Sequence, residues 1–235
     1  MQREKKPVYV WQLPVRVFHW INALCIVALF ATGLYIGNPF GSPTVPEEAY
    51  YSFFMGWARY IHFIAAFLFT ANLLVRGYWL IVGNKYSRPN PLRREFWMGM
   101  LETIKSYLFL KNKKPHYVGH NPLAEMGYMI FIGLGSVLMV LTGYVMYLEP
   151  QWESAAGTAF SWVARLLGGD SFGIRSLHHF VAWGFAIFVP IHIYMAIRED
   201  WMSRNATISS IITGYKYETE QEAEELERGE ETKAG

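Results

Sequence analysis

The chain has 235 residues, of which 52% are hydrophobic and only 17% are charged, and its formal net charge is +2. So little charge argues against a soluble domain, and the composition indicates one integral membrane domain. The net charge is too small to suggest nucleic acid as a partner. The single cysteine, Cys25, excludes an internal disulfide and a cysteine-ligated cluster.

The N-terminal arm, residues 1–16, is basic and leads into the first of four apolar segments. That segment is too long for the apolar region of a signal peptide and has no A-x-A cleavage site, so we expect it to stay in the protein. Four segments are long enough to cross about 30 Å of hydrocarbon. They are residues 17–37, 57–82, 126–148 and 177–197.

The charges between these segments predict their orientation. The first connection has no Lys or Arg, and the third has only Arg165 and Arg175, whereas the second carries eight such residues. Positively charged connections stay in the cytoplasm. We therefore expect a multi-pass protein of the inner (cytoplasmic) membrane, with both termini and the second connection in the cytoplasm.

Some structure is also expected outside the spans. Residues 158–169 and 94–111 are amphipathic and suit helices on the outer and cytoplasmic membrane surfaces, although an ordered loop fits the first nearly as well. After Tyr217 the chain becomes acidic and poor in apolar residues. We expect residues 1–217 to form a single membrane domain and residues 218–235 to form an acidic tail that is disordered or only fractionally helical.

Histidines lie near the ends of three spans. Imidazole is costly in lipid, so it usually faces the interior of a helix bundle. His178 and His192 are fourteen residues apart, a spacing that turns a helix by about 1400° and rises about 21 Å, so the two rings share one face. His179 points roughly 140° away from His192. The spacing predicts two separate sites, one near each membrane surface.

The predicted topology pairs these histidines by depth. His62 and His178 fall at the outer level, and His19 and His192 fall at the cytoplasmic level. Two pairs, each drawn from different helices, are what two bis-histidine haems stacked across a membrane require. Because two imidazoles fill both axial positions of haem iron, this pattern favours electron transfer over oxygen chemistry.

Histidines in membrane helices also form hydrogen bonds, bind zinc or relay protons. A single membrane histidine is more often a hydrogen-bond partner between helices than a ligand, but agreement in depth at four positions favours ligands. Structural zinc would gather four ligands at one point. A proton relay would normally bring Asp or Glu into the spans, and the predicted membrane cores contain none.

Further residues could serve a cofactor or substrate. Arg76, inside the second span, could neutralise a haem propionate, and its side chain could equally extend to the cytoplasmic surface. His116, in the second connection, is expected to be only a solvated side chain. His120 and Asn121 belong to the sequence GHNP before the third span and could help to form a ligand pocket.

Small residues within the spans form a second pattern. Gly33, Gly133, Gly135 and Gly143 would let helices, or a flat cofactor, approach closely. The sequence ATGLY from Ala31 resembles LTGYV from Leu141, but two short matches do not establish a repeat.

Five segments resemble the b-type cytochrome subunit of membrane-bound nickel-iron hydrogenases. They are LPVRVFHW from Leu13, RYIHF from Arg59, GNKYSRP from Gly83, GHNPLAEMGY from Gly119 and HIYMAIRED from His192, and the resemblance runs from about residue 8 to 217. It implies an all-α membrane bundle of four helices with two haem b groups, whose ligands lie on the first, second and fourth helices. Carried over to this chain, the ligand positions match His19, His62, His178 and His192.

The resemblance also implies partners and a respiratory role. An iron-sulfur small subunit on the extracytoplasmic face would pass on electrons from hydrogen oxidised in a nickel-iron large subunit, and this chain would anchor both to the membrane. Electrons would cross from the outer to the inner haem and reduce a quinone near His192, His120 and Asn121. Quinone reduction would be the chain's only chemistry. The alternatives are the di-haem subunit of a formate dehydrogenase or thiosulfate reductase type complex, and a haem-free membrane anchor.

Overall fold

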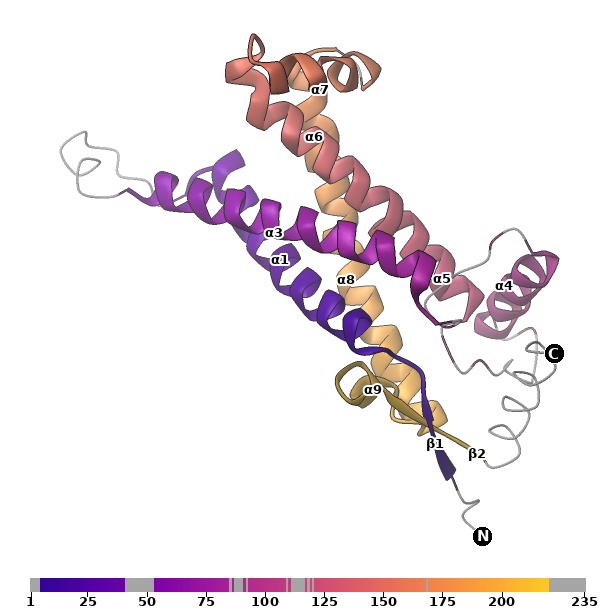
Figure 1. Cartoon of the computed structure of the whole chain (residues 1–235). Coiled ribbons are helices and arrows are strands. Elements are labelled where there is room, and N and C mark those ends of the chain that lie inside the picture. Colours follow the sequence, from indigo (N-terminus) through magenta and orange to yellow (C-terminus); the bar gives the residue numbers. More distant parts are fainter. Residues whose placement is uncertain are drawn as a thin grey trace. The chain divides into compact units, whose positions relative to one another are not determined.

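The computed structural model describes residues 5–40, 53–84, 86, 91, 93–108, 110, 117, 119, 121–167 and 169–219. In this part of the chain, four helical segments are long and apolar enough to cross a membrane. They are α1 (Leu13–Gly37), α3 (Phe54–Val82), the segment Pro122–Gln151 and α8 (Ser171–Ser203). Each contains one predicted span, which confirms the expected four-helix membrane protein (Figure 1).

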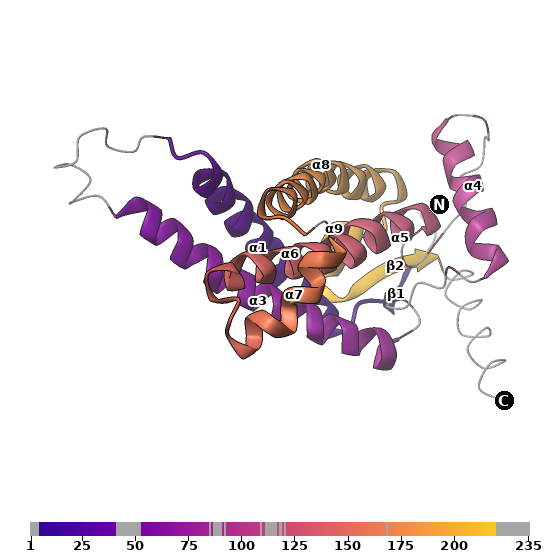
Figure 2. The ribbon, with the colours of Figure 1, turned by 90° about the horizontal axis from the view of Figure 1, so that it is seen from above.

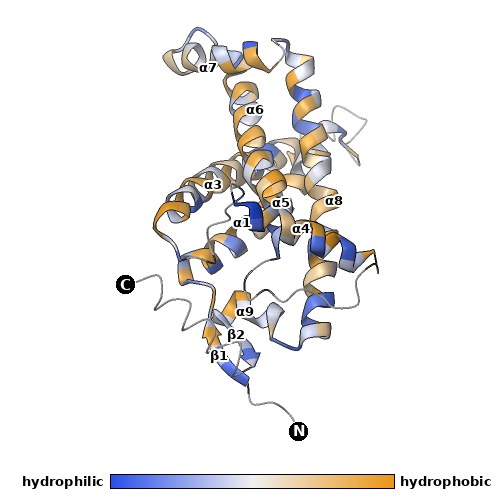
Figure 3. Ribbon diagram, turned by 90° about the vertical axis from the view of Figure 1, so that its right-hand side faces the viewer, coloured by the Kyte–Doolittle hydropathy of each residue, from blue (hydrophilic) through white to orange (hydrophobic). Residues whose placement is uncertain are grey.

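The composition of these segments explains why they are helical. In lipid no water can satisfy backbone polar groups, so an apolar segment meets that need through its own helical hydrogen bonds. Hydrophobic residues predominate along α3 and α6 in Figure 3. α8 continues through Pro190, although proline removes one helical hydrogen bond.

The third segment changes its helical geometry along its length. It consists of α5 (Pro122–Tyr128), the π-helix η2 (Met129–Gly135), α6 (Ser136–Leu148) and the 3-10 turn η3 (Glu149–Gln151). Asn121 caps the start, because its Oδ1 accepts a hydrogen bond from the backbone N–H of Ala124 at 2.8 Å. Pro122 suits the first helical position, where no N–H is needed.

Both segments expected to form surface helices are helical. In residues 94–111 the helix is α4 (Arg94–Tyr107), which ends four residues earlier than expected. In residues 158–169 the helix is α7 (Ala155–Leu166), which begins and ends three residues earlier than expected. It starts there because the Ser154 hydroxyl accepts a hydrogen bond from the backbone N–H of Gly157 at 3.0 Å, which is an N-cap.

The chain forms two compact units, each built from separate stretches of sequence. The terminal unit contains Met1–His19, Gly77–Tyr128 and Pro190–Gly235. The central unit contains Trp20–Arg76 and Met129–Val189. Every membrane-crossing segment contributes one part to each unit, so both units draw on all four helices.

A two-stranded sheet, which the sequence did not predict, joins the two ends of the chain in the terminal unit. Strands β1 (Lys5–Tyr9) and β2 (Tyr215–Thr219) pair antiparallel (Figure 1). The short helix α9 (Thr207–Thr213) leads into β2 through Gly214, whose φ of 91° suits glycine. β2 extends two residues past the boundary expected for the membrane domain, and Glu218 is only 2% exposed. Residues 220–235 of the predicted tail lie outside the described part.

A set of polar contacts holds the start of α1 in the terminal unit. Gln12 Oε1 accepts hydrogen bonds from the Trp79 indole at 2.9 Å and from the Asn84 backbone N–H at 3.1 Å. The Asn84 side chain in turn donates to the backbone oxygen of Val10 at 2.9 Å. These bonds join the residues just before α1 to the end of α3, which fixes the helix that carries His19.

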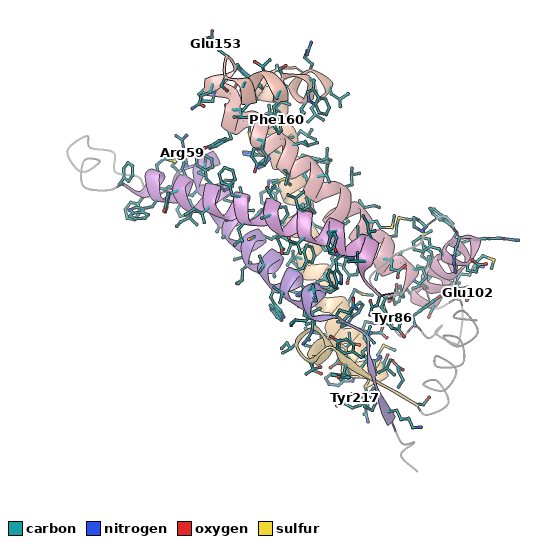
Figure 4. All side chains as sticks on the ribbon, in the orientation of Figure 1. Arg59, Tyr86, Glu102, Glu153, Phe160 and Tyr217 are labelled. Atoms are coloured by element: carbon teal, nitrogen blue, oxygen red, sulfur yellow. The ribbon has the colours of Figure 1, made fainter. Side chains whose placement is uncertain are left out.

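The central unit has an apolar core where α6, α7 and α8 meet. Val145, Val163 and Ile174, one from each helix, are almost fully buried against one another. α7 lies across the end of α6 (Figure 2). Phe160 of α7, which is labelled in Figure 4, packs on Tyr144 of α6 with ring centres 5.7 Å apart. This packing supports the part of α8 that carries His178.

Candidate functional site

The four histidines singled out in the sequence fall into two pairs, one in each unit. His19 and His192 belong to the terminal unit, and His62 and His178 belong to the central unit. All four side chains are partly buried, whereas His179 is exposed. Within the described residues, no three His, Cys, Asp or Glu side chains converge on one point to bind a metal ion directly.

In the terminal unit, α1 and α8 bring His19 and His192 together. Their ring centres are 6.2 Å apart and the ring planes are inclined by 58°. A bond from a metal to an imidazole nitrogen is about 2 Å long, so two rings that bind one metal from opposite sides have centres roughly 6 Å apart. The separation of this pair therefore fits two axial ligands of one haem iron.

Tyr128, at the end of α5, is a close polar neighbour of His192. Its hydroxyl lies 3.1 Å from Nδ1 of His192, and the two rings meet edge to face with centres 5.6 Å apart. The contact occupies Nδ1 of His192, so Nε2 is the nitrogen of that ring suited to bind a metal.

In the central unit, His62 of α3 contacts α1. Nδ1 of His62 lies 2.9 Å from the hydroxyl oxygen of Thr32. The next residue, Gly33, lies so close that a Cβ atom at its position would be 3.4 Å from Cε1 of His62. The imidazole thus rests on a Thr-Gly dipeptide of the neighbouring helix.

His178 of α8 contacts α6 in the same manner. Its Nδ1 lies 2.8 Å from the hydroxyl oxygen of Thr142, and a Cβ atom at Gly143 would be 3.6 Å from its Cε1. His62 and His178 both belong to the central unit. The predicted outer pair is therefore gathered in one unit, and both of its Nδ1 atoms contact threonine.

His179 lies apart from this arrangement. It is exposed, and its ring contacts the end of α1, where a Cβ atom at Gly37 would be 3.1 Å from its Cε1. Of the two adjacent histidines, His178 is therefore the more buried one, and its Nδ1 contacts Thr142.

The remaining predicted residues are less closely tied to the pairs. Arg76 is partly buried on α3, and its contact with a propionate stays a prediction. His116 and His120 lie outside the described residues. Asn121 uses its side-chain oxygen to cap α5 and lies near Tyr107 of α4. Burial raises the pKa of the Tyr107 phenol, and nearby Glu199 raises it further, so this phenol stays protonated at neutral pH.

Three residues that contact the histidines were not predicted from the sequence, namely Thr32, Thr142 and Tyr128. A signal for the two threonines was present, because each is the Thr of the similar segments ATGLY and LTGYV. Gly33 and Gly143 of the same segments also lie beside the histidine rings, where a Cβ atom would be at van der Waals distance, 3.4 and 3.6 Å.

The chain is similar to known proteins over almost its whole length. Residues 10–214 match the family model described as prokaryotic cytochrome b561. A protein of Cupriavidus necator named as a probable Ni/Fe-hydrogenase B-type cytochrome subunit is 41% identical over 216 residues, which is 90% of this chain and 87% of that protein. The probable Ni/Fe-hydrogenase 1 B-type cytochrome subunit of Escherichia coli K12 is 41% identical over 215 residues, covering 88% and 90% of the two chains. An Azotobacter vinelandii protein with the same name as the first is 37% identical over 219 residues, covering 91% and 90%.

Proposed function

This chain belongs to the prokaryotic cytochrome b561 family, and we propose that it binds two haem b groups and passes electrons from a nickel-iron hydrogenase to quinone. It is similar to hydrogenase-associated b-type cytochrome subunits over about nine-tenths of its length. The names of these relatives support a hydrogenase as the electron donor over a formate dehydrogenase or thiosulfate reductase.

The observation that carries the proposal is the separation of His19 and His192, whose ring centres are 6.2 Å apart. These two rings would hold one haem in the terminal unit, and His62 and His178 would hold the other in the central unit. Haem iron with two imidazole ligands exchanges single electrons and offers no open site to oxygen. Tyr128, Thr32 and Thr142 orient three of the four rings through Nδ1.

The charge distribution supports a direction for electron flow. With the Lys- and Arg-rich second connection in the cytoplasm, His19 and His192 lie near the cytoplasmic surface, and His62 and His178 lie near the outer one. An iron-sulfur small subunit on the outer face, attached to the nickel-iron large subunit, would deliver electrons to the central unit. α8 carries one histidine of each pair, so it links the two sites. The chain would also anchor the hydrogenase in the inner membrane.

The proposed quinone site lies in the terminal unit, near His192, His120 and Asn121. Asn121 lies near Tyr107, whose protonated phenol can donate a hydrogen bond to a quinone oxygen. Protons for the reduced quinone would then come from the cytoplasm. Arg76 would neutralise a haem propionate, since a buried guanidinium is stabilised by an opposite charge.

Optical difference spectra of the complex in membranes test this proposal. We expect b-type bands that appear on adding hydrogen and disappear on adding an oxidised quinone. Without any b-type bands, the chain would be a haem-free anchor. Bands that formate reduces and hydrogen does not would assign the chain to a different donor. A matched sample with the large subunit inactivated should show bands with dithionite but none with hydrogen.

A further inference from the structure

The similar segments ATGLY and LTGYV perform the same local task in two helix pairs. In the first pair, Thr32 and Gly33 of α1 contact His62 of α3, and in the second, Thr142 and Gly143 of α6 contact His178 of α8. In both, the Thr-Gly dipeptide is on the earlier helix and the histidine is near the start of the later one. The resemblance between the two short segments is therefore a structural repeat at this site.

The other hydrogen bonds of the two threonines determine which atom donates in each hydrogen bond between threonine and histidine. Thr32 Oγ1 lies 2.6 Å from the backbone oxygen of Ala28, and Thr142 Oγ1 lies 2.6 Å from that of Leu138. Two oxygens approach this closely only when a hydrogen lies between them, so each hydroxyl donates its one hydrogen to its own helix. The hydroxyl oxygen can then only accept from imidazole. Nδ1 of His62 and of His178 must therefore carry the hydrogen.

A fixed Nδ1–H has a direct consequence for the other ring nitrogen. Neutral imidazole carries one N–H, so Nε2 of each ring keeps a free lone pair, which is the form that binds a metal. A ligand histidine that donates its other N–H to an acceptor is more basic and is held in one orientation. Gly33 lies beside the ring, where a Cβ atom would be at van der Waals distance, 3.4 Å, from Cε1 of His62.

We infer that Thr32 and Thr142 are positioning residues that hold Nε2 of His62 and His178 toward haem iron and lower the midpoint potential of the central site. The inference rests on the proposed function, since it requires these two histidines to be axial ligands. A more basic ligand favours ferric over ferrous iron, which is why acceptance of the N–H lowers the potential. The low potential suits the site that receives electrons first.

Thr70 provides a matched control within the same unit. Its hydroxyl donates to the backbone oxygen of Ala66 at 2.8 Å, so it makes the same bond to its own helix as Thr32 and Thr142. It lies on α3, eight residues after His62. Among the described residues, the Thr70 hydroxyl forms a hydrogen bond only within its own helix. Its replacement therefore removes that bond and no hydrogen bond to a histidine.

The test is a redox titration of the intact complex in which Thr32, Thr142 or Thr70 is replaced. Valine keeps the shape of threonine and removes the hydroxyl, whereas serine keeps the hydroxyl. We expect Thr32→Val and Thr142→Val each to raise the midpoint potential of one b-type component and leave the other unchanged. The low-spin electron paramagnetic resonance signal of the shifted component should broaden as its imidazole loses a fixed orientation. Serine variants should titrate as the native protein does.

Haem content and the control variant separate the possible outcomes. A valine variant could lose one haem altogether. The positioning role is supported if Thr70→Val then keeps both haems and the serine variant at the same threonine also keeps both. Equal shifts in Thr70→Val and Thr32→Val would overturn it, because the effect would then come from the helix alone. Unchanged potentials in both valine variants would also overturn it. A native protein without b-type bands would instead refute the proposed function.

Discussion

Each unit contains one of the two histidine pairs, and the surroundings of the rings differ. In the central unit, Nδ1 of each ring contacts a threonine whose hydrogen is committed to its own helix. In the terminal unit, Nδ1 of His192 contacts the phenol of Tyr128 at a longer distance, 3.1 Å. A phenol sits at the end of a long side chain and can rotate its hydrogen. The helix backbone therefore fixes the hydroxyl that each central ring meets, whereas His192 in the terminal unit meets a hydroxyl that can rotate.

This difference matches the tasks that the proposed function gives to the two units. A site that only receives and passes on electrons benefits from ligands with one fixed orientation. The terminal unit would also have to serve quinone reduction, where hydrogen bonds change as protons are taken up. It contains the polar residues suited to that role, including Tyr107, Asn121 and Tyr128.

Removal of a proposed ligand is the strongest way to break the comparison. His62→Ala and His178→Ala should each remove the same b-type component, and His19→Ala and His192→Ala should each remove the other. Haem iron with only one axial protein ligand is held loosely in its site. Quantified haem should fall to about half in every variant. The terminal variants should still be reduced by hydrogen yet fail to reduce quinone, which rapid optical mixing can follow.

His179→Ala is the control for these four variants. The exposed ring of His179 contacts the end of α1 at Gly37, so both haem components should remain. If His179→Ala lost the central haem component while His178→Ala kept it, the outer ligand would be His179 and not His178.

A cavity in the central core should weaken that unit alone. Ile174 is 2% exposed and packs with Val145 and Val163, four residues before His178. Ile174→Ala should destabilise the packing by roughly 2–5 kcal/mol. On heating, the central b-type component should be lost at a lower temperature than in the native protein. Ile193→Ala, at a 51% exposed position of the same helix, should have a much smaller effect. If Ile174→Ala lowered the loss temperature of both b-type components equally, the two units would not melt separately.

Tyr128→Phe sharpens the comparison between the two kinds of hydrogen bond. A single hydrogen bond contributes about 1 kcal/mol, and this one is longer than those of the threonines. We expect a small rise in the midpoint potential of the terminal component only, measured by redox titration. A rise larger than that in Thr32→Val would contradict the view that the central rings are the more tightly fixed.

The smallest effect is expected from removing residues 220–235. That segment is acidic and poor in apolar residues, so it can bury little surface against the bundle. Haem content and quinone reduction should stay at native levels. Ending the chain at Gly214 is the informative counterpart, because it also removes β2 and the hydrogen bond from Lys216 to the backbone oxygen of Gly119. If the shorter deletion were as damaging as the longer one, the tail would have a structural role.

Several features of the molecule followed from the sequence because they depend on contiguous residues. Hydropathy over about 20 residues identifies a membrane-crossing helix, and all four predicted spans lie within the observed ones. Helical periodicity separated His178 from His179, which the structure buries to different extents. Both amphipathic segments are helical, and the ends of the two helices differ from the expected ones by at most four residues. α7 begins three residues earlier than expected because Ser154 caps it.

Other features depend on contacts between residues that are far apart in the sequence. Thr32 and His62 are 30 residues apart, Thr142 and His178 are 36 apart, and Trp11 and Ser210 are 199 apart. Whether such side chains meet is decided by the rotation and packing of whole helices, which no local pattern encodes. The pairing of β1 with β2 is of the same kind. The sequence thus determined which helices form and which faces carry histidine, whereas the tertiary structure decided which hydroxyl His62, His178 and His192 each meet.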